Sequence, residues 1–211
     1  MDHKKQTYAK QAATIIENLG KRNIEGIYCA SKEQAAEKAL AIMEEGATVA
    51  WGGSMTLQEC GLMDKLYKSG LTLIDRDKAS TPEEKIARER EAFGCNYYLM
   101  SSNAITIDGQ LVNIDGHGNR VAALINGPDH VLILVGVNKI VPDVNAGIDR
   151  IQNLAAPANV SRFGLKTPCS ATGFCGDCQS LDSVCCQIVI TRLSRHPGRI
   201  KVILIGEELG Y

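Results

Sequence analysis

The sequence predicts an α/β protein whose mainly parallel sheet is flanked by helices and carries one β-hairpin. Apolar segments of strand length alternate with helical patterns along most of the 211-residue chain, as in parallel α/β proteins. Asp108-Gly109 separates two alternating apolar segments, which is typical of a tight hairpin turn. Hydrophobic residues make up 45% of the chain and charged residues 22%, enough for a folded core. Since no linker divides the sequence, we expect one domain over residues 1–211.

The first half of the chain alternates helices and strands. Tyr8, Ala12, Ile15, Ile16 and Leu19 share one helical face, and Gly20 follows as a stop signal. Ser31 and Gln34 have capping-box spacing and open a second helix, which Gly46 should end. The other elements expected here are a buried strand at 48–51, a helix from about 55 to 68, a strand at 71–76, a helix from Thr81 to about Phe93 and a strand at 96–101.

The second half opens with the hairpin at 104–114. Residues 130–137, HVLILVGV, form the most apolar segment, so we expect this strand near the centre of the sheet. A helix should follow Pro142 and end before Pro157. The remaining segments are a cysteine-rich loop at 168–186, a strand or helix at 187–193 and a closing strand at 199–206.

Charge and hydropathy exclude several classes of protein. The formal net charge is −1 and no long basic run is present, which argues against nucleic-acid binding through phosphate contacts. The N-terminus has no apolar signal-peptide region, and no apolar run is long enough to span a bilayer. We therefore expect a cytoplasmic protein without a membrane partner. The sequence leaves open whether it forms a homo-oligomer.

A glycine turn follows the strand at 48–51. Gly52, Gly53 and Ser54 stand between that strand and the next helix, where backbone N–H groups can bind an anion. An ordinary strand–helix turn with Ser54 as the helix cap explains the same residues, and both interpretations stand.

Polar residues gather at the predicted ends of the neighbouring strands. In open α/β sheets, ligands bind where strand ends meet loops, although such residues also serve ordinary turns. We interpret His117 as an exposed loop residue and Glu59 as a surface carboxylate. Asn138 and Lys139 leave the most apolar strand at its end, where Lys139 could neutralise an anionic substrate. The other candidate ligand-binding residues are Ser102, Asn103, Asn113, Asp115, Gly116, Gly118 and Asn119.

Five of the eight cysteines lie between Pro168 and Cys186. A reducing compartment disfavours disulfides, so the cluster is more readily a metal or redox site. The spacing is close to a plant-type Fe–S motif, whereas zinc sites more often contain two CxxC pairs. An Fe–S cluster, zinc and a metal-free thiol loop all remain open. Cys186 is set aside because adjacent strand residues point to opposite faces. The candidate ligands are Cys169, Cys175, Cys178 and Cys185.

Several long motifs together resemble the lactate-utilisation (LUD) domain family, from about residue 5 to the end. They include GGSMTLQECGL, SSNAITIDGQLVNIDGHGNRVAALINGP, VGVNKIVPDVNAGIDRI and CSATGFCGDCQSLDSVC, in the family's order. The resemblance implies a fold like those of sugar-phosphate isomerases and CoA transferases, in which a glycine loop binds an anionic group. It also matches the four candidate cysteine ligands to the family's C-terminal segment. The CoA-transferase glutamate nucleophile matches no residue of this chain.

The resemblance implies a role in L-lactate or related 2-hydroxy-acid oxidation, with a small anionic metabolite as ligand and Fe–S oxidoreductase subunits as partners. Two other functions remain open. One is a transferase or isomerase acting on a phosphorylated or CoA-linked metabolite. The other is a non-catalytic assembly or regulatory subunit, because no nucleophile–base pair is recognisable and the catalytic residues are unknown.

Overall fold

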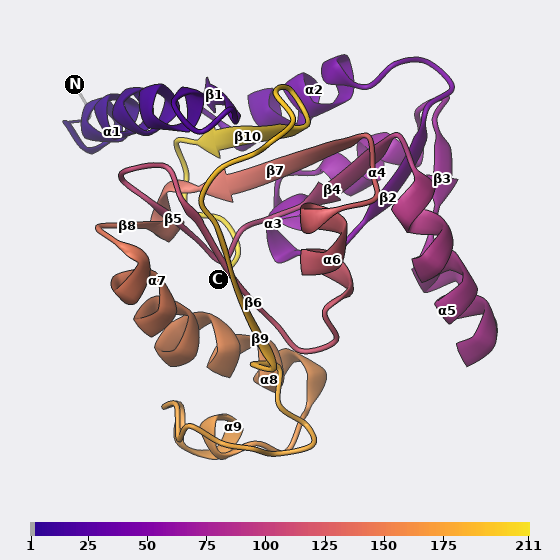
Figure 1. Ribbon diagram of the computed structural model, residues 1–211, viewed down its shortest axis with the longest axis vertical. Coiled ribbons are helices and arrows are strands. Elements are labelled where there is room, and N and C mark those ends of the chain that lie inside the picture. The colour runs from indigo at the N-terminus through magenta and orange to yellow at the C-terminus, as the bar shows by residue number, and fades with distance from the viewer. Residues whose placement is uncertain (1–2) are drawn as a thin grey trace.

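The structure, a computed structural model, describes residues 3–211 and is built around a six-stranded sheet whose strands all run parallel (Figure 1). The apolar strand β7 lies inside this sheet, paired with β10 on one side and β4 on the other, as its composition predicts. In spatial order the strands are β1 (Glu25–Cys29), β10 (Ile200–Ile205), β7 (His130–Gly136), β4 (Tyr97–Met100), β2 (Thr48–Trp51) and β3 (Thr72–Ile74).

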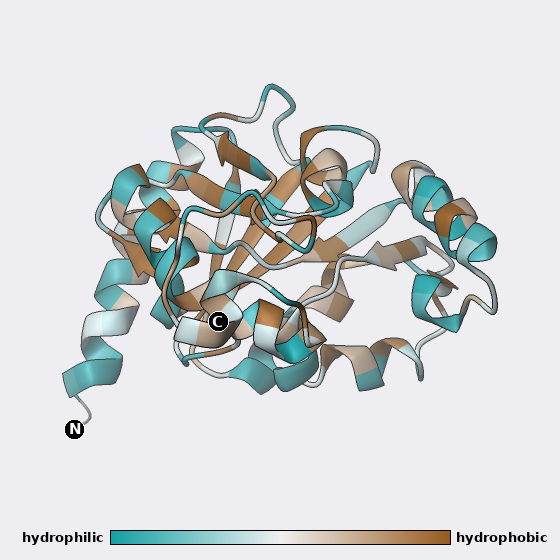
Figure 2. Ribbon diagram, turned by 90° about the horizontal axis from the view of Figure 1, so that it is seen from below, coloured by the Kyte–Doolittle hydropathy of each residue, from teal (hydrophilic) through white to brown (hydrophobic). Residues whose placement is uncertain are grey.

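Helices cover both faces of this sheet, and the apolar residues concentrate in its strands (Figure 2). On one face pack α1 (His3–Gly20), α6 (Asn119–Ile125) and the turn after α5 (Pro82–Glu91). On the other face pack α2 (Lys32–Ile42), α3 (Met55–Glu59) and α4 (Leu62–Leu66). Alternate residues of each strand enter the two cores, as the period of two in a strand requires. The predicted α/β fold with a parallel sheet is confirmed.

A second, four-stranded sheet carries the predicted hairpin. The antiparallel pair β5–β6 is joined by a turn at Asp108-Gly109, where Gly109 has a φ of +85°. The outer strands are β8, parallel to β5, and β9, antiparallel to β6. The strands are β8 (Ile140–Val141), β5 (Ala104–Thr106), β6 (Leu111–Asp115) and β9 (Gln187–Thr191). Segment 187–193, predicted as strand or helix, is therefore a strand over most of its length.

A helical segment packs on the second sheet and leads to the cysteine-rich loop (Figure 1). Val112 and Ile114 of β6 pack with Ile151 and Ala155 of this segment in a small apolar cluster. The segment comprises α7 (Val144–Arg150), a π-helical turn (Ile151–Ala155) and α8 (Ala156–Phe163), and α9 (Pro168–Thr172) follows within the cysteine-rich part.

Several predicted boundaries were wrong, each for a local reason. The helix expected at 55–68 is two short helices, because Gly61 adopts φ +72° between them. The helix expected to end before Pro157 continues to Phe163, and Pro157 lies directly after the π-helical turn at Ile151–Ala155. The second helix ends at Ile42 rather than Gly46, because Met43 turns to an extended conformation. No helix within residues 3–211 is long and apolar enough to cross a membrane.

Candidate functional site

The glycine turn after β2 packs tightly against the first sheet. The N–H of Gly52 donates to Leu99 O at 3.0 Å. A Cβ at Gly52 would lie 3.2 Å from both the Tyr98 hydroxyl and Cγ of Arg120, so the turn has no room for a side chain there. Ser54 Oγ accepts from Leu57 N at 3.4 Å and thereby caps α3. Because α3 is only five residues long, we attribute any affinity for anions here to side chains rather than to this helix.

A small pocket with an interior of about 10 Å³ lies beside this turn, at the carboxyl ends of β2 and β3. In parallel α/β sheets this edge is where ligands bind. Cationic, phenolic and amide side chains line the pocket together with apolar groups. The polar and aromatic lining residues are Trp51, Arg76, Arg88, Glu89, Phe93, Tyr98 and Asn119.

Arg76 places its guanidinium beside Gly53 of the glycine turn. Its Nη1 donates to Glu89 Oε1 at 2.9 Å, and its Nη2 would lie 3.5 Å from a Cβ on Gly53. Its Nε is buried, has no hydrogen-bond acceptor among residues 3–211 and lies 3.9 Å from Asp77 Oδ1. A buried N–H without an acceptor costs free energy, which an additional acceptor would recover.

Tyr98 supplies a neutral hydroxyl to the same pocket. Only 3% of its surface is exposed, and burial raises the pKa of its phenol to about 12. The charges of Arg76 and Arg120 act in the opposite direction but do not overcome burial. The hydroxyl therefore keeps its proton at neutral pH and can donate to a ligand oxygen.

Arg120 is 8% exposed, and all of its guanidinium N–H groups donate to acceptors within the protein. An arginine that is satisfied in this way holds structure rather than substrate. The acceptors are Asp115 Oδ1, 3.2 Å from Nε; Ser101 O and Asn113 Oδ1, 2.9 and 2.6 Å from Nη1; and Asn103 Oδ1 and Ile114 O, 2.7 and 3.0 Å from Nη2.

The polar strand ends predicted from the sequence thus meet at Arg120. The side-chain oxygens of Asn103, Asn113 and Asp115 all point at its guanidinium. The second oxygen of Asp115 accepts from Val121 N at 3.1 Å, at the start of α6. These acceptors are occupied, and their role as ligand contacts stays a prediction from the sequence.

The other residues that the sequence predicts for the site lie in different places in the structure. Asn119 lines the pocket, whereas the Ser102 hydroxyl is buried and donates to Ala104 O at 2.8 Å. Gly116 packs against the loop before β9, where a Cβ would lie 2.9 Å from Val184 Cα. Gly118 enters α6 with φ +85°. His117 is exposed, with its Nε2 3.4 Å from Glu89 Oε2 at the edge of the pocket.

Lys139 lies at the end of β7, almost fully buried at 3% exposure. Its Nζ donates to Thr56 Oγ1 at 2.7 Å and to Ser101 Oγ at 3.0 Å. Burial, followed by the charges of Arg150 and Arg120, lowers the pKa of this amine to about 7. We predicted from the sequence that Lys139 neutralises an anion. The lowered pKa of its amine adds a second role, in which the amine is uncharged.

The C-terminal residues form a strap over this amine. Leu209 N donates to Asn138 Oδ1 at 3.2 Å, and Asn138 Nδ2 donates to Gly210 O at 3.0 Å. Gly210 N donates to Glu59 Oε2 at 2.7 Å. Asn138 and Glu59 thus hold the strap, which we define as Leu209–Tyr211. Asn138, predicted to contact a ligand, contacts the chain itself.

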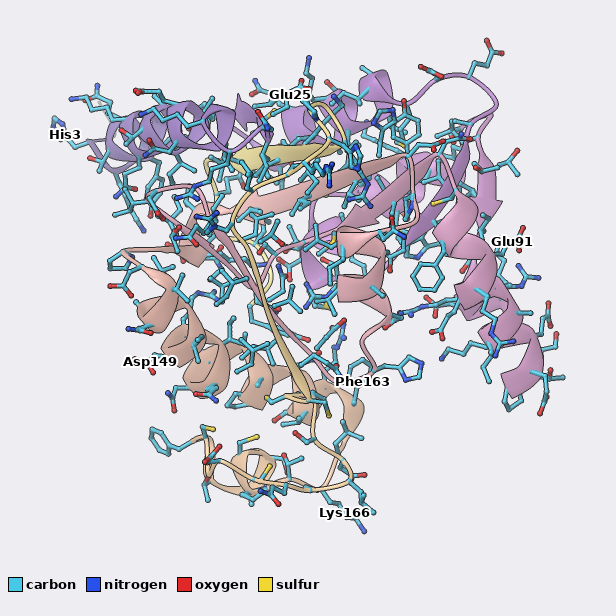
Figure 3. The ribbon with its side chains drawn as sticks, viewed as in Figure 1. His3, Glu25, Glu91, Asp149, Phe163 and Lys166 are labelled. Atoms are coloured by element: carbon cyan, nitrogen blue, oxygen red, sulfur yellow. The ribbon has the colours of Figure 1, made fainter. Side chains whose placement is uncertain are left out.

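The four candidate cysteine ligands lie in one loop near Lys166, away from the pocket (Figure 3). Burial, together with the charges of its neighbouring thiols, raises the pKa of Cys185 to about 11, so the sulfurs lie near one another. Cys186 is exposed and also acts on Cys185, and its exclusion from the set stays a prediction.

The loop does not have the geometry of a single-ion site. Among residues 3–211, no three His, Cys, Asp or Glu side chains form a group that could hold a metal ion. An Fe–S cluster contains several iron atoms, so its cysteine sulfurs lie farther apart than those around one metal ion. Four cysteine thiolates are its usual ligands. Cys175 Sγ accepts from Asp177 N at 3.4 Å, a backbone hydrogen bond of the kind that tunes such clusters. An Fe–S cluster, zinc and a metal-free thiol loop all stay predictions from the sequence.

The sequence interpretation missed several residues of this region. Arg76 is the last residue of the strand predicted at 71–76, so a search of strand ends, which selected Lys139, could have found it. Arg120 lies within a motif that was recognised, but only the structure shows that its neighbours point at it. Tyr98 and Thr56 sit inside a strand and a helix and carry no sequence signal of a site.

Comparison with known proteins places the chain among sequences of one family. The family model described as the LUD domain matches residues 12–205. The chain is similar to the crystal structure of a DUF162 family protein from Deinococcus radiodurans, with a TM-score of 0.54 and 14% sequence identity. The match covers 94% of this chain and 98% of that chain. At this identity the likeness shows the fold alone.

More distant structures resemble part of the chain. Ribose 5-phosphate isomerase A from Neisseria gonorrhoeae covers 63% of each chain at 17% identity, with a TM-score of 0.36. The match to the translation initiation factor eIF-2B of Pyrococcus horikoshii covers 56% of this chain and 50% of that chain at 18% identity, also with a TM-score of 0.36. Likenesses this distant say nothing about chemistry. No curated protein matches the sequence.

Proposed function

The chain belongs to the LUD domain family, and on this premise we propose that it serves the utilisation of L-lactate or a related 2-hydroxy acid. In this proposal the protein binds the small carboxylate in the pocket beside Gly52 and Gly53 and works with Fe–S oxidoreductase subunits. The observation that carries the proposal is Arg76, which lines the pocket with a buried Nε that has no acceptor among residues 3–211.

The chemistry of the lining suits a 2-hydroxy acid. A guanidinium binds a carboxylate through charge-assisted hydrogen bonds. Tyr98 and the Asn119 amide offer further polar groups for a neighbouring hydroxyl. The interior of the pocket holds only about 10 Å³, about the space of one water molecule, so a small metabolite would bind at its mouth.

Glu89 makes the pocket selective for an anion of modest charge. It neutralises part of Arg76 through the 2.9 Å contact between Oε1 and Nη1. A monoanion can take the unpaired Nε without disturbing this ion pair, whereas a phosphate would bring a second negative charge close to Glu89. This favours a monocarboxylate over a sugar phosphate.

The cysteine loop is the place we propose for an Fe–S cluster. Such a cluster would carry single electrons between this protein and a partner subunit. The residues that would hold it are Cys169, Cys175, Cys178 and Cys185. The pocket and this loop belong to different parts of the fold, so anion binding and cluster binding can be tested separately.

Thermal unfolding in the presence of candidate ligands tests the proposal. A ligand that binds only the folded protein adds about 2.7 kcal/mol of stability at a concentration about 100 times its dissociation constant. We expect stabilisation by L-lactate and pyruvate. Stabilisation by sugar phosphates or CoA esters alone would replace the proposal with a transferase or isomerase function.

A further inference from the structure

Lys139 is a buried cation without an anionic partner. Its Nζ contacts only the hydroxyls of Thr56 and Ser101, and it forms no ion pair with a carboxylate of residues 3–211. The charged groups that act on it are Arg120 and Arg150, which oppose its protonation, and Glu59, which favours it. Because desolvation and the two guanidiniums outweigh one carboxylate, the amine is uncharged in much of the protein at neutral pH.

The two hydroxyls differ in what they can do for the amine. Thr56 uses its own proton to donate to Leu209 O at 3.3 Å, so it can only accept from Lys139. The Ser101 hydroxyl can donate to Ser102 O at 3.3 Å, which is a long and weak hydrogen bond. Ser101 can therefore turn its proton toward the amine or accept a proton from it, as a proton-transfer group must.

Arg150 offers a site for a carboxylate next to this amine. Its Nε donates to Asn138 O at 3.0 Å and its Nη1 to Asn103 O at 2.9 Å, so both partners are neutral carbonyls. Its Nη2 is buried without an acceptor among residues 3–211. This guanidinium carries a positive charge that no carboxylate of the described chain neutralises.

We propose that Lys139 forms an imine with the carbonyl group of a small 2-oxo acid whose carboxylate binds Arg150. The amine nitrogen attacks the carbonyl carbon, a C–N bond forms, and the carbonyl oxygen leaves as water after taking two protons, which Ser101 can relay. No oxidant or reductant is consumed. An amine activated by desolvation and by neighbouring cations is the form in which lysine attacks carbonyl compounds. The inference rests on the proposed function only for its substrate class, since a 2-oxo acid is what oxidation of a 2-hydroxy acid yields.

The strap controls access to the amine. Gly210 lies directly over it: a Cβ there would lie 2.7 Å from Thr56 Oγ1 and 3.4 Å from Lys139 Nζ. The 2-oxo acid reaches the amine when the strap lifts, and the contact between Gly210 N and Glu59 opposes this. Removing the Glu59 carboxylate should both loosen the strap and lower the pKa of the amine further, since its charge is the one that favours protonation.

Reductive trapping tests the inference. The full chain is incubated with pyruvate and sodium borohydride, and its mass and peptide map are measured. We expect one reduced adduct per chain, located at Lys139, formed faster in Glu59→Ala and absent in Lys139→Arg. Lys166→Arg, which removes an exposed lysine, should react like the wild type. Because the peptide map uses the wild-type protein, the result does not depend on whether a variant folds.

Two outcomes separate this inference from the proposed function. Stabilisation of the wild type by lactate and pyruvate, with no adduct or with adducts scattered over exposed lysines, would overturn the imine and leave the pocket intact. An adduct at Lys139 without any stabilisation by lactate would uphold the imine and count against the Arg76 pocket.

Discussion

The side-chain oxygen of Asn113 accepts a 2.6 Å hydrogen bond from Nη1 of Arg120, and both residues are buried. Asn113 comes from the second sheet and Arg120 from a helix on the first. The bond therefore fastens the two sheets together beside the glycine turn, where Cγ of Arg120 limits the space above Gly52. The shape of the pocket depends on this junction, which the first two predictions test.

Arg120→Met should destabilise the protein by about 3–5 kcal/mol, because it leaves Asp115 and several buried acceptors without their donor. Urea denaturation followed by circular dichroism measures the change. Arg195→Met, at an exposed arginine, is the matched control and should cost less than about 0.5 kcal/mol. A loss below about 1 kcal/mol in Arg120→Met would refute the junction.

Gly52→Ala should cost about 1–3 kcal/mol and weaken ligand binding, since its Cβ would meet Tyr98 and Arg120 at 3.2 Å. Gly20→Ala is the control, because a Cβ there meets nothing within 4 Å and alanine favours the helix that Gly20 ends. Thermal unfolding of both variants gives the comparison. Equal stability of the two variants would show that the turn is looser than its contacts indicate.

Much of the fold follows from local sequence patterns. The most apolar segment became an interior strand, and Asp108-Gly109 made the hairpin turn, because both signals are carried by adjacent residues. Strand β1 was missed since its sequence, EGIYC, has no alternating apolar pattern, and it is held by pairing with β10 from the far end of the chain. Helix α6 was missed because its short sequence directly follows a stretch of turn residues.

The site was harder to predict than the fold. The sequence indicated that polar residues gather at the strand ends, and they do, but it could not show that Asn103 and Asn113 face Arg120. Whether a polar side chain serves a ligand or a neighbour depends on contacts between distant segments. The strap over Lys139 could not be predicted from the sequence for the same reason, because the contact that holds it joins Asn138 and Leu209, which are 71 positions apart.

The stability of the protein should rise with pH between about 7 and 10.5 through Lys139. Below about pH 7 the amine is protonated in both the folded and the unfolded chain and contributes no pH dependence. Above that pH the folded protein has lost the proton and the unfolded chain, with its ordinary pKa of 10.5, still binds it. The unfolded state then binds more protons, so the free energy of unfolding increases with pH, by at most about 1.4 kcal/mol per unit.

Lys139→Met isolates this effect. We expect the difference in unfolding free energy between the wild type and Lys139→Met to grow in favour of the wild type from pH 7 to pH 9. Denaturation curves at several pH values measure it. Parallel pH profiles over this range would show that the amine titrates as an ordinary lysine.

Protein prepared without oxygen should contain iron and acid-labile sulfide, bound by the cysteine loop. Serine in place of Cys175 or Cys178 should remove most of both, whereas Cys186→Ser should retain them, because Cys186 is the exposed cysteine outside the set. Elemental analysis and the visible spectrum report the result. A colourless, iron-free wild type under these conditions would end the cluster proposal.

The central claim is that a small carboxylate binds through Arg76, and calorimetric titration with L-lactate tests it most directly. The account predicts binding of one lactate per chain to the wild type. It also predicts at least about tenfold weaker binding to Arg76→Met, the loss of one charge-assisted hydrogen bond. Binding to Arg90→Met, which removes an exposed arginine from the same region, should be unchanged. A wild type that does not bind lactate, or an Arg76→Met variant that binds it equally well, would contradict the claim.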